Sequence, residues 1–225
     1  MNENAKKYSG IFVLLGMIYV TCLLVSNLIA GKMWSPGLGI SLPASVILFP
    51  ITYIFADVFT EVYGFEHAKL IIWSGFACNF IAVITYIITV DLPYPEFFME
   101  QEAFAVVFGM TPRVLVASFI AYLFGEFSNS IVLSKLKVIT KGEKLWLRTI
   151  GSTVVGEALD SMIFIAIAFA GTVATGQLFL MMLFQYLFKL LFEIILTPVT
   201  YKVIGKLKKV EGVDKYDYDQ KYSLF

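Results

Sequence analysis

The sequence predicts an all-α integral membrane protein with six transmembrane helices. Of its 225 residues 59% are hydrophobic, and the mean hydropathy is +0.81, whereas ordinary soluble domains contain about 45–50% apolar residues. The apolar residues form runs of about 20, the length that a helix needs to cross a bilayer. The basic residues lie mostly between these runs, on one side of a six-span topology.

The spans are expected at residues 10–30, 43–63, 69–90, 112–134, 147–171 and 177–205, between an N-terminal segment (1–9) and a C-terminal tail (206–225). The first apolar run exceeds the 7–15 residues of a signal peptide core and lacks an A-x-A-like cleavage site, so we expect a retained helix. Residues 31–42 are expected to form a turn-rich loop, and residues 91–111 to contain a short interfacial helix. The sixth span is long enough to tilt. The tail is charged and rich in tyrosine, and we expect it to be loosely ordered.

The distribution of basic residues predicts the orientation. With six spans, both termini and the second and fourth connections share one side of the membrane. That side holds fourteen of the seventeen basic residues: Lys6, Lys7, Lys69, Lys135, Lys137, Lys141, Lys144, Arg148, Lys202, Lys206, Lys208, Lys209, Lys215 and Lys221. The positive-inside rule makes this side, and both termini, cytoplasmic.

Two consecutive spans carry nearly the same polar phrase, Gly-Glu-x-x-(Asn/Asp)-Ser. It occurs as Gly125-Glu126-Phe127-Ser128-Asn129-Ser130 and as Gly156-Glu157-Ala158-Leu159-Asp160-Ser161. On a helix the acid, the second polar group and the serine lie on one face. An ionised group inside a membrane costs at least about 2.5–3.5 kcal/mol, so two such stripes predict a functional site. Their presence in oppositely directed spans is typical of an inverted internal repeat, with a site near the midplane.

Acidic residues outnumber basic residues inside the spans. The acids are Asp57, Glu61, Glu126, Glu157, Asp160 and Glu193, against Lys189 and Arg113. Without partners such acids must be protonated or must wait for a ligand that donates hydrogen bonds, which predicts a transport site or a proton relay. A network that only holds helices together is the alternative, but such networks normally use neutral side chains.

Several single residues have a structural alternative. Gln185, Lys189 and Glu193 share one helix face, and Lys189 and Glu193 are spaced to neutralise each other. Arg113 is placed to extend toward the membrane surface. Among the many aromatic residues, Tyr53, Phe127 and Phe164 lie one turn from the acids and are the stacking candidates.

Missing motifs narrow the function classes. No Gly-x-x-x-x-Gly-Lys-(Ser/Thr) sequence is present, so a P-loop ATPase is not predicted. The only histidine, His67, lies in a short connection, so neither Ser-His catalysis nor a His/Cys metal site is supported. An intramembrane aspartyl protease built on Asp57 and Asp160 is the least favoured alternative. We expect no enzyme activity, no cofactor, no metal and no nucleic-acid partner.

Several short motifs resemble one family across roughly residues 26–201. They are Ser26-Asn27; Phe49-Pro50 with Asp57-x-x-x-Glu61-x-Tyr63-Gly64; Arg113 with Ala117-Ser118-Phe119 and Ala121-Tyr122; the two Gly-Glu phrases; Arg148-Thr149 with Ser152-Thr153; and Lys189 with Pro198. Their order and spacing resemble the bacterial queuosine precursor transporter family, whose members have also been described as vitamin uptake transporters. The resemblance implies a six-helix protein of the bacterial inner membrane that imports 7-cyano- and 7-aminomethyl-7-deazaguanine.

The residues fit such a ligand, because a buried carboxylate accepts paired hydrogen bonds from a guanine-like edge. The candidate substrate-binding residues are Asn27, Asp57, Glu61, Arg113, Glu126, Asn129, Glu157, Asp160, Gln185 and Lys189. We expect Glu157 or Asp160 to bind the guanine edge, with Lys189 as the counter-charge. Two alternatives stay open, namely the substrate-binding subunit of an ATP-energised vitamin importer and a carrier for another purine or vitamin. The oligomeric state that we expect is a homodimer.

Overall fold

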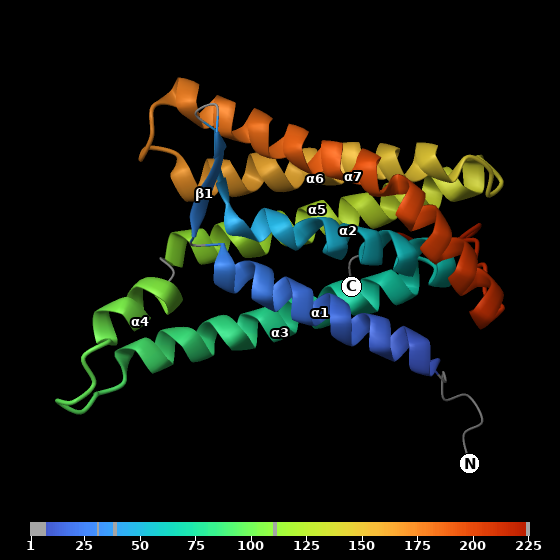
Figure 1. Cartoon of the computed structure of the whole chain (residues 1–225). Helices are drawn as coiled ribbons and strands as arrows, with labels where there is room; N and C mark the ends of the chain where they lie inside the picture. Colours follow the sequence, from blue (N-terminus) through green and yellow to red (C-terminus); the bar gives the residue numbers. More distant parts are fainter. Residues whose placement is uncertain (1–7, 31, 38–39, 110–111, 224–225) are drawn as a thin grey trace, which may run out of the picture.

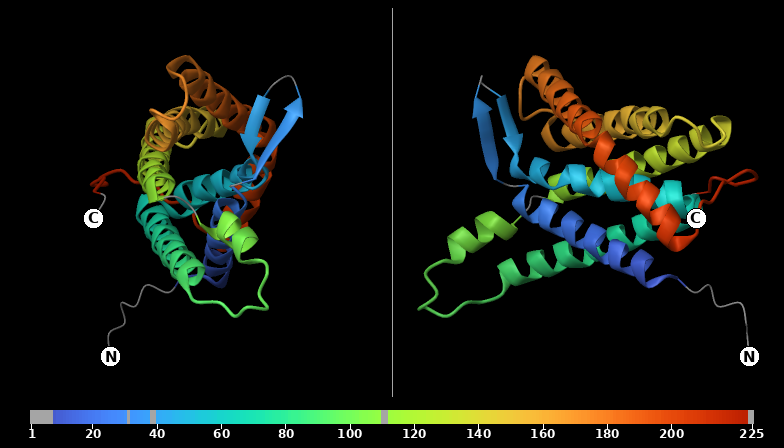
Figure 2. Two further views of the ribbon diagram at one scale, coloured as in Figure 1. Left: turned by 90° about the vertical axis from the view of Figure 1, so that its left-hand side faces the viewer. Right: turned by 45° about the vertical axis from the view of Figure 1, so that its right-hand side comes forward.

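The computed structural model describes residues 8–30, 32–37, 40–109 and 112–223. Its elements are α1 (Gly10–Ile29), β1 (Met33–Gly37), β2 (Ile40–Pro43), the 3₁₀ helix η1 (Ala44–Ile47), α2 (Phe49–Val58), the π-helix η2 (Phe59–Tyr63), α3 (Phe65–Asp91), α4 (Gln101–Phe108), α5 (Pro112–Ile139), α6 (Leu145–Phe169) and α7 (Thr175–Glu211). The long helices run roughly side by side (Figures 1 and 2).

Five helical stretches in the described part of the chain are long and apolar enough to cross a membrane. They are Gly10–Ile29, Phe65–Asp91, Gln101–Ile139, Leu145–Phe169 and Thr175–Glu211. Their outer faces keep large apolar side chains exposed, as at Met17, Ile81 and Phe179, each 64% exposed. Such faces suit contact with lipid, and the fold is that of a mostly helical, multi-pass membrane protein. A sixth crossing and an inverted repeat stay predictions.

The predicted second span is not one continuous α-helix, so that expectation was wrong in detail. Residues 44–63 form the 3₁₀ helix η1, then α2 and then the π-helix η2. Pro50 lies in the first turn of α2, where its missing N–H breaks no hydrogen bond. The segment ends at Gly64, whose φ of +84° suits glycine better than any residue with a Cβ atom.

This broken segment is the most deeply enclosed part of the bundle. It contacts α1, α5 and α7, and η2 also contacts α3, so it lies at the centre of the helices in Figure 2. Every residue of η2 is buried, and so are Thr52, Asp57 and Val58. The polar groups Asp57 and Glu61 are therefore placed in the interior.

Two connections have more structure than the sequence indicated. The loop expected at 31–42 contains an antiparallel hairpin, in which Met33 pairs with Pro43 and Trp34 with Leu42; Gly31 and Gly39 of this loop lie outside the described residues. The short helix expected within 91–111 is confirmed as α4. Its location at a membrane interface stays a prediction.

The two repeated phrases meet where α5 and α6 cross. A Cβ atom on Gly125 would lie 2.9 Å from the Cβ atom of Asp160, and one on Gly156 would lie 2.9 Å from the carbonyl oxygen of Gly125. Such distances are too short for any side chain, so glycine at both positions allows the two backbones to approach. The acids beside both glycines are thereby brought close together.

The tail is docked, and the expectation of loose order was wrong. Residue 212 turns the chain back after α7, and the Lys215 N–H donates to the Val62 carbonyl at 3.1 Å. The Asp217 carboxylate accepts from the Phe65 N–H at 2.9 Å and from the Ser134 hydroxyl at 2.7 Å. The Tyr222 ring packs against that of Phe65 at 5.1 Å. Composition alone predicted disorder because it could not show these buried partners.

Replacing Asp217 by alanine should release the tail. The change removes two hydrogen bonds to a buried carboxylate and should lower the free energy of unfolding by about 2 kcal/mol. The measurement is unfolding in detergent, with limited proteolysis to detect cleavage after residue 212. Asp219→Ala, at an exposed position two residues further along, is the matched control. Equal stability and equal cleavage of the two variants would show that the carboxylate does not hold the tail.

Candidate functional site

A lysine held between two carboxylates lies at the centre of the α5–α6–α7 packing. The Lys189 ammonium on α7 is 2.8 Å from Glu157 Oε2 and also pairs with Asp160 Oδ2, both on α6. It lies 5.4 Å from the centre of the Tyr53 ring. Lys189 is 3% exposed and Glu157 6%. At this depth each charge needs the other, because an unpaired ion loses its hydration without compensation.

Further acids surround this pair without a matching base. On α5, Asn129 Nδ2 donates to Asp57 Oδ1 at 2.9 Å, and Glu126 is buried beside it. One oxygen each of Asp57 and Glu126, and the Asn129 carbonyl oxygen, have no hydrogen-bond partner among the described residues. We call Asp57, Glu126, Asn129, Glu157, Asp160 and Lys189 the central cluster. It offers several unused acceptors and one cation, which suits a polar ligand rich in N–H donors.

The central cluster is closed around very little space. Two cavities lie against it, of about 10 Å³ and 30 Å³, and both are lined by Tyr53, Gly125, Glu126 and Glu157. Such volumes have room for a water molecule or two. A ligand the size of a purine base fits only if the helices move apart. The structure therefore has the cluster in an occluded arrangement.

The sequence-predicted site residues divide into two groups. Six of the ten form the central cluster. Lys189 pairs across to α6, which favours the counter-charge hypothesis over neutralisation by Glu193 on its own helix; both Glu193 oxygens lack a hydrogen-bond partner among the described residues. Tyr53 lines both cavities, as a stacking residue would.

Four predicted site residues lie elsewhere. Asn27 donates to Asn79 at 3.0 Å, linking α1 to α3. Arg113 is exposed and donates to the carbonyl oxygens of Ile167 and Ala170 at 2.5 Å each, which satisfies the end of α6. Gln185 is half-buried and lines neither cavity.

Glu61 and the stacking candidate Phe127 also lie outside the central cluster. Glu61 belongs to the network described next. Phe127 packs in an apolar cluster with Phe65 and Ile72.

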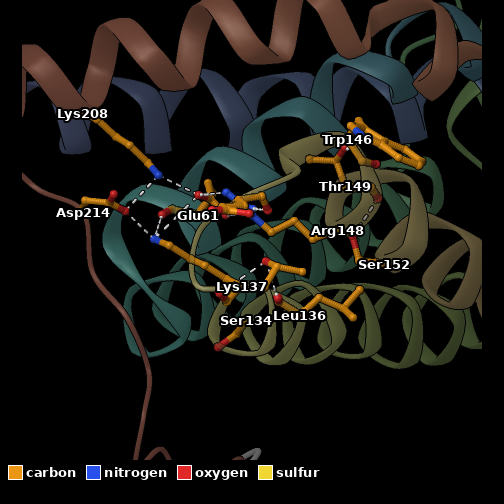
Figure 3. A network of polar contacts seen from close by, with 12 residues as sticks. Glu61, Ser134, Leu136, Lys137, Trp146, Arg148, Thr149, Ser152, Lys208 and Asp214 are labelled. Carbon is orange, nitrogen blue, oxygen red and sulfur yellow. Dashed lines mark hydrogen bonds and ion pairs between the residues drawn. The ribbon is translucent and has the colours of Figure 1, made fainter.

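Glu61 is the centre of a separate ionic network (Figure 3). The fully buried carboxylate accepts from Arg148 Nε and Nη2 at 2.7 Å each and from Lys208 at 2.7 Å. Lys137 lies 3.7 Å from the same carboxylate and donates to the Glu61 carbonyl at 2.5 Å. These groups join η2 to α5, α6 and α7. The two-pronged contact with Arg148 is the strongest geometry available to a carboxylate.

Asp214 of the tail completes this Glu61 network. Its Oδ1 lies 2.6 Å from Lys137 and 2.8 Å from Lys208. Partial burial raises the pKa of Asp214, but the hydrogen bonds and charges of the two lysines outweigh it and hold the pKa below its ordinary value. A lowered pKa gives stability that is complete above the unfolded-state pKa and is lost as the pH falls through the folded-state pKa. The contact therefore persists at neutral pH and opens only in acid.

The sequence analysis missed this network and part of the cavity lining. It assigned Lys137, Arg148 and Lys208 to the basic side of the membrane only, although Arg148 was already part of a family motif. Leu23, Thr52, Tyr122 and Thr153 also line the cavities. No metal site accompanies either cluster, since no group of three or more His, Cys, Asp or Glu side chains suitable for a metal occurs in the described part of the chain.

Arg148→Gln should destabilise the fold. It removes the two-pronged partner of a buried carboxylate, a loss that costs about 3 kcal/mol in folding free energy. Unfolding in detergent measures the change. Lys209→Gln, an exposed basic residue next to Lys208, serves as the control and should be nearly neutral. A loss below about 1 kcal/mol for Arg148→Gln would mean that the Lys208 and Lys137 contacts alone hold Glu61.

Comparison with known proteins assigns the family. Residues 43–203 match the family described as "Putative vitamin uptake transporter". The chain is 28% identical over 166 residues to a Bacillus subtilis protein named "Probable queuosine precursor transporter", covering 72% of each chain. It is also 28% identical over 164 residues to a Haemophilus influenzae protein of the same name, covering 70% of this chain and 66% of that one. No solved structure matches. The chain belongs to the putative vitamin uptake transporter family.

Proposed function

We propose that this chain imports queuosine precursors, 7-cyano- and 7-aminomethyl-7-deazaguanine, across the bacterial inner membrane as a secondary carrier or facilitator. The names of its relatives supply the ligand class. The observation that carries the mechanism is the buried Lys189 between Glu157 and Asp160. Fourteen basic residues on one predicted side support cytoplasmic termini. A homodimer stays part of the proposal without a described interface.

The central cluster suits the hydrogen-bonding edge of a 7-deazaguanine. This edge donates from a ring N–H and an exocyclic amine and accepts at a carbonyl oxygen. A carboxylate of Glu157 or Asp160 accepts the two donors side by side. Lys189 or the Asn129 amide donates to the ligand carbonyl. The aminomethyl form carries a further cation, which the surplus of acids over Lys189 accommodates.

Binding must exchange partners within the cluster. In the occluded arrangement Lys189 occupies the carboxylates that the ligand would use. An arriving base replaces one of these contacts, so the buried acid passes from one set of donors to another and is not left unpaired. The neighbouring helices separate to admit the ligand, because about 30 Å³ does not hold a base. Movement of helix groups against each other around a fixed site is the usual basis of alternating access.

Glu157→Gln and Asp160→Asn should each impair binding and uptake of 7-aminomethyl-7-deazaguanine. The loss of a charged hydrogen bond costs about 1.5–3 kcal/mol, equivalent to a fall in affinity of roughly 10- to 150-fold. Affinity is measured on the purified protein in detergent, and uptake of labelled base in liposomes that contain only this chain. Glu102→Gln, an exposed acid on α4, should leave both unchanged.

The outcomes separate the alternatives. Saturable uptake by the wild-type chain, competed by the 7-cyano form, supports an autonomous carrier. Binding without uptake would favour the subunit of an ATP-energised importer. Wild-type affinity in both variants would remove Glu157 and Asp160 from the site, and no binding by the wild type would overturn the ligand class.

A further inference from the structure

Glu193 is a buried acid that the proposed substrate site does not use. It lies on α7 one turn after Lys189 and is 2% exposed. Both of its carboxylate oxygens lack a hydrogen-bond partner among the described residues. Ionisation of a carboxyl group with this burial and no partner is strongly unfavourable. A carboxylic acid does not carry this cost, so the position favours the protonated form.

Asp57 is a second buried acid whose side chain is not fully partnered. Asp57 and Glu193 belong to α2 and α7, which pack against each other, and the charge of Glu193 disfavours ionisation of Asp57. Asp57 is 1% exposed, and its Oδ2 also lacks a partner in the described part of the chain. Two acids that share a dry site cannot both ionise without a compensating cation. Together they hold at least one proton or await another small cation.

Among the described residues, the ionisable groups that act most strongly on the pair are themselves acids. Besides Glu193, Asp57 faces Glu126 on α5 and Glu61 on η2. Glu193 faces Glu157 on α6. All of these are acids, Glu61 is already bound by its own cations, and Glu157 is paired with Lys189. These neighbouring acids therefore make it still less favourable for Asp57 and Glu193 to be ionised together, so a bound proton is favoured.

The backbone beside each acid is irregular. The α-helix that carries Asp57 changes to the π-helix η2 two residues later. Pro198 lies inside α7 five residues after Glu193, and the Thr197 hydroxyl donates to the Glu193 carbonyl at 2.8 Å. Both features are common sites of helix bending. A change of charge on the pair thus acts on two helices at points where they can bend.

We propose that Asp57, at the edge of the central cluster, and Glu193, outside it, together form a proton-binding site that couples import to the proton gradient. This inference rests on the proposed function. One proton binds a carboxylate of the pair from the outer side, giving a neutral acid, and leaves to the cytoplasm when that acid ionises again. Asn129 connects the two sites, because it donates to Asp57 at 2.9 Å and lines a substrate cavity.

The test uses liposomes that contain the full-length chain and an internal pH dye. The ligand is 7-cyano-7-deazaguanine, which is uncharged, so any acidification of the interior reports co-transported protons. The wild type should acidify the interior when ligand is added outside, and an inward proton gradient should raise accumulation at least fivefold. Glu193→Gln should abolish both effects while binding the ligand with a Kd within about threefold of the wild type. Glu102→Gln is the matched control.

Each result has a distinct meaning. Wild-type uptake without acidification, or uptake driven only by a sodium gradient, would overturn the proton site and leave the carrier intact. Accumulation of ligand against a gradient by Glu193→Gln would likewise overturn the proton site and leave the carrier intact. No uptake by the wild type would instead refute the proposed function. If Glu193→Gln fails to fold, Asp57→Asn is examined in its place, and proton movement in that variant overturns the inference.

Discussion

The need to neutralise a fully buried carboxylate, Glu61, determines how one end of this bundle is assembled. Its partners come from α5, α6 and α7, and the tail joins through Asp214. None of these elements is adjacent to η2 in the sequence. An uncompensated charge at this depth is strongly destabilising, whereas the complete set of contacts is self-consistent. The network therefore selects one arrangement of five separate segments, namely η2, α5, α6, α7 and the tail.

The central cluster is subject to the same need to neutralise buried charge, but there the need is not fully met. Around Lys189 the acids exceed the bases, and several carboxylate oxygens lack partners in the described part of the chain. Such an excess of acids does not stabilise a fold, because apolar side chains would pack there at lower cost in free energy. A transporter can use it, since the missing partners arrive with a ligand or a proton. The contrast between a satisfied and an unsatisfied network is the reason for proposing a structural role for the first and a functional role for the second.

Much of this arrangement was predictable from the sequence. Runs of apolar residues gave four of the long helices closely, and the two Gly-Glu phrases predicted that polar stripes would share a site. The second span was harder, because a buried segment interrupted by Pro50 and ending in a π-helix has the same composition as a continuous helix. Basic residues at helix ends ordinarily indicate only the orientation in the membrane, and this was the interpretation given to Lys137, Arg148 and Lys208. Their role depends on contacts with Glu61 that sequence spacing does not encode, and the same is true of Asp217 in the docked tail.

The positions of the two charge clusters constrain how the bundle can open. The Glu61 network fixes η2, α5, α6, α7 and the tail at the end where α3 begins. Two of the unsatisfied acids, Asp57 and Glu193, lie two residues before η2 and five residues before Pro198. Movement there breaks few strong contacts, whereas movement at the Glu61 end breaks several buried ion pairs at once. The occluded arrangement is therefore expected to open first at the opposite end, where Arg113 contacts α6 through carbonyl oxygens alone. Access from the Glu61 end requires the Glu61 network to separate. Because that step is the costlier one, the proposed ligand binding and proton transfer would have to supply free energy for it.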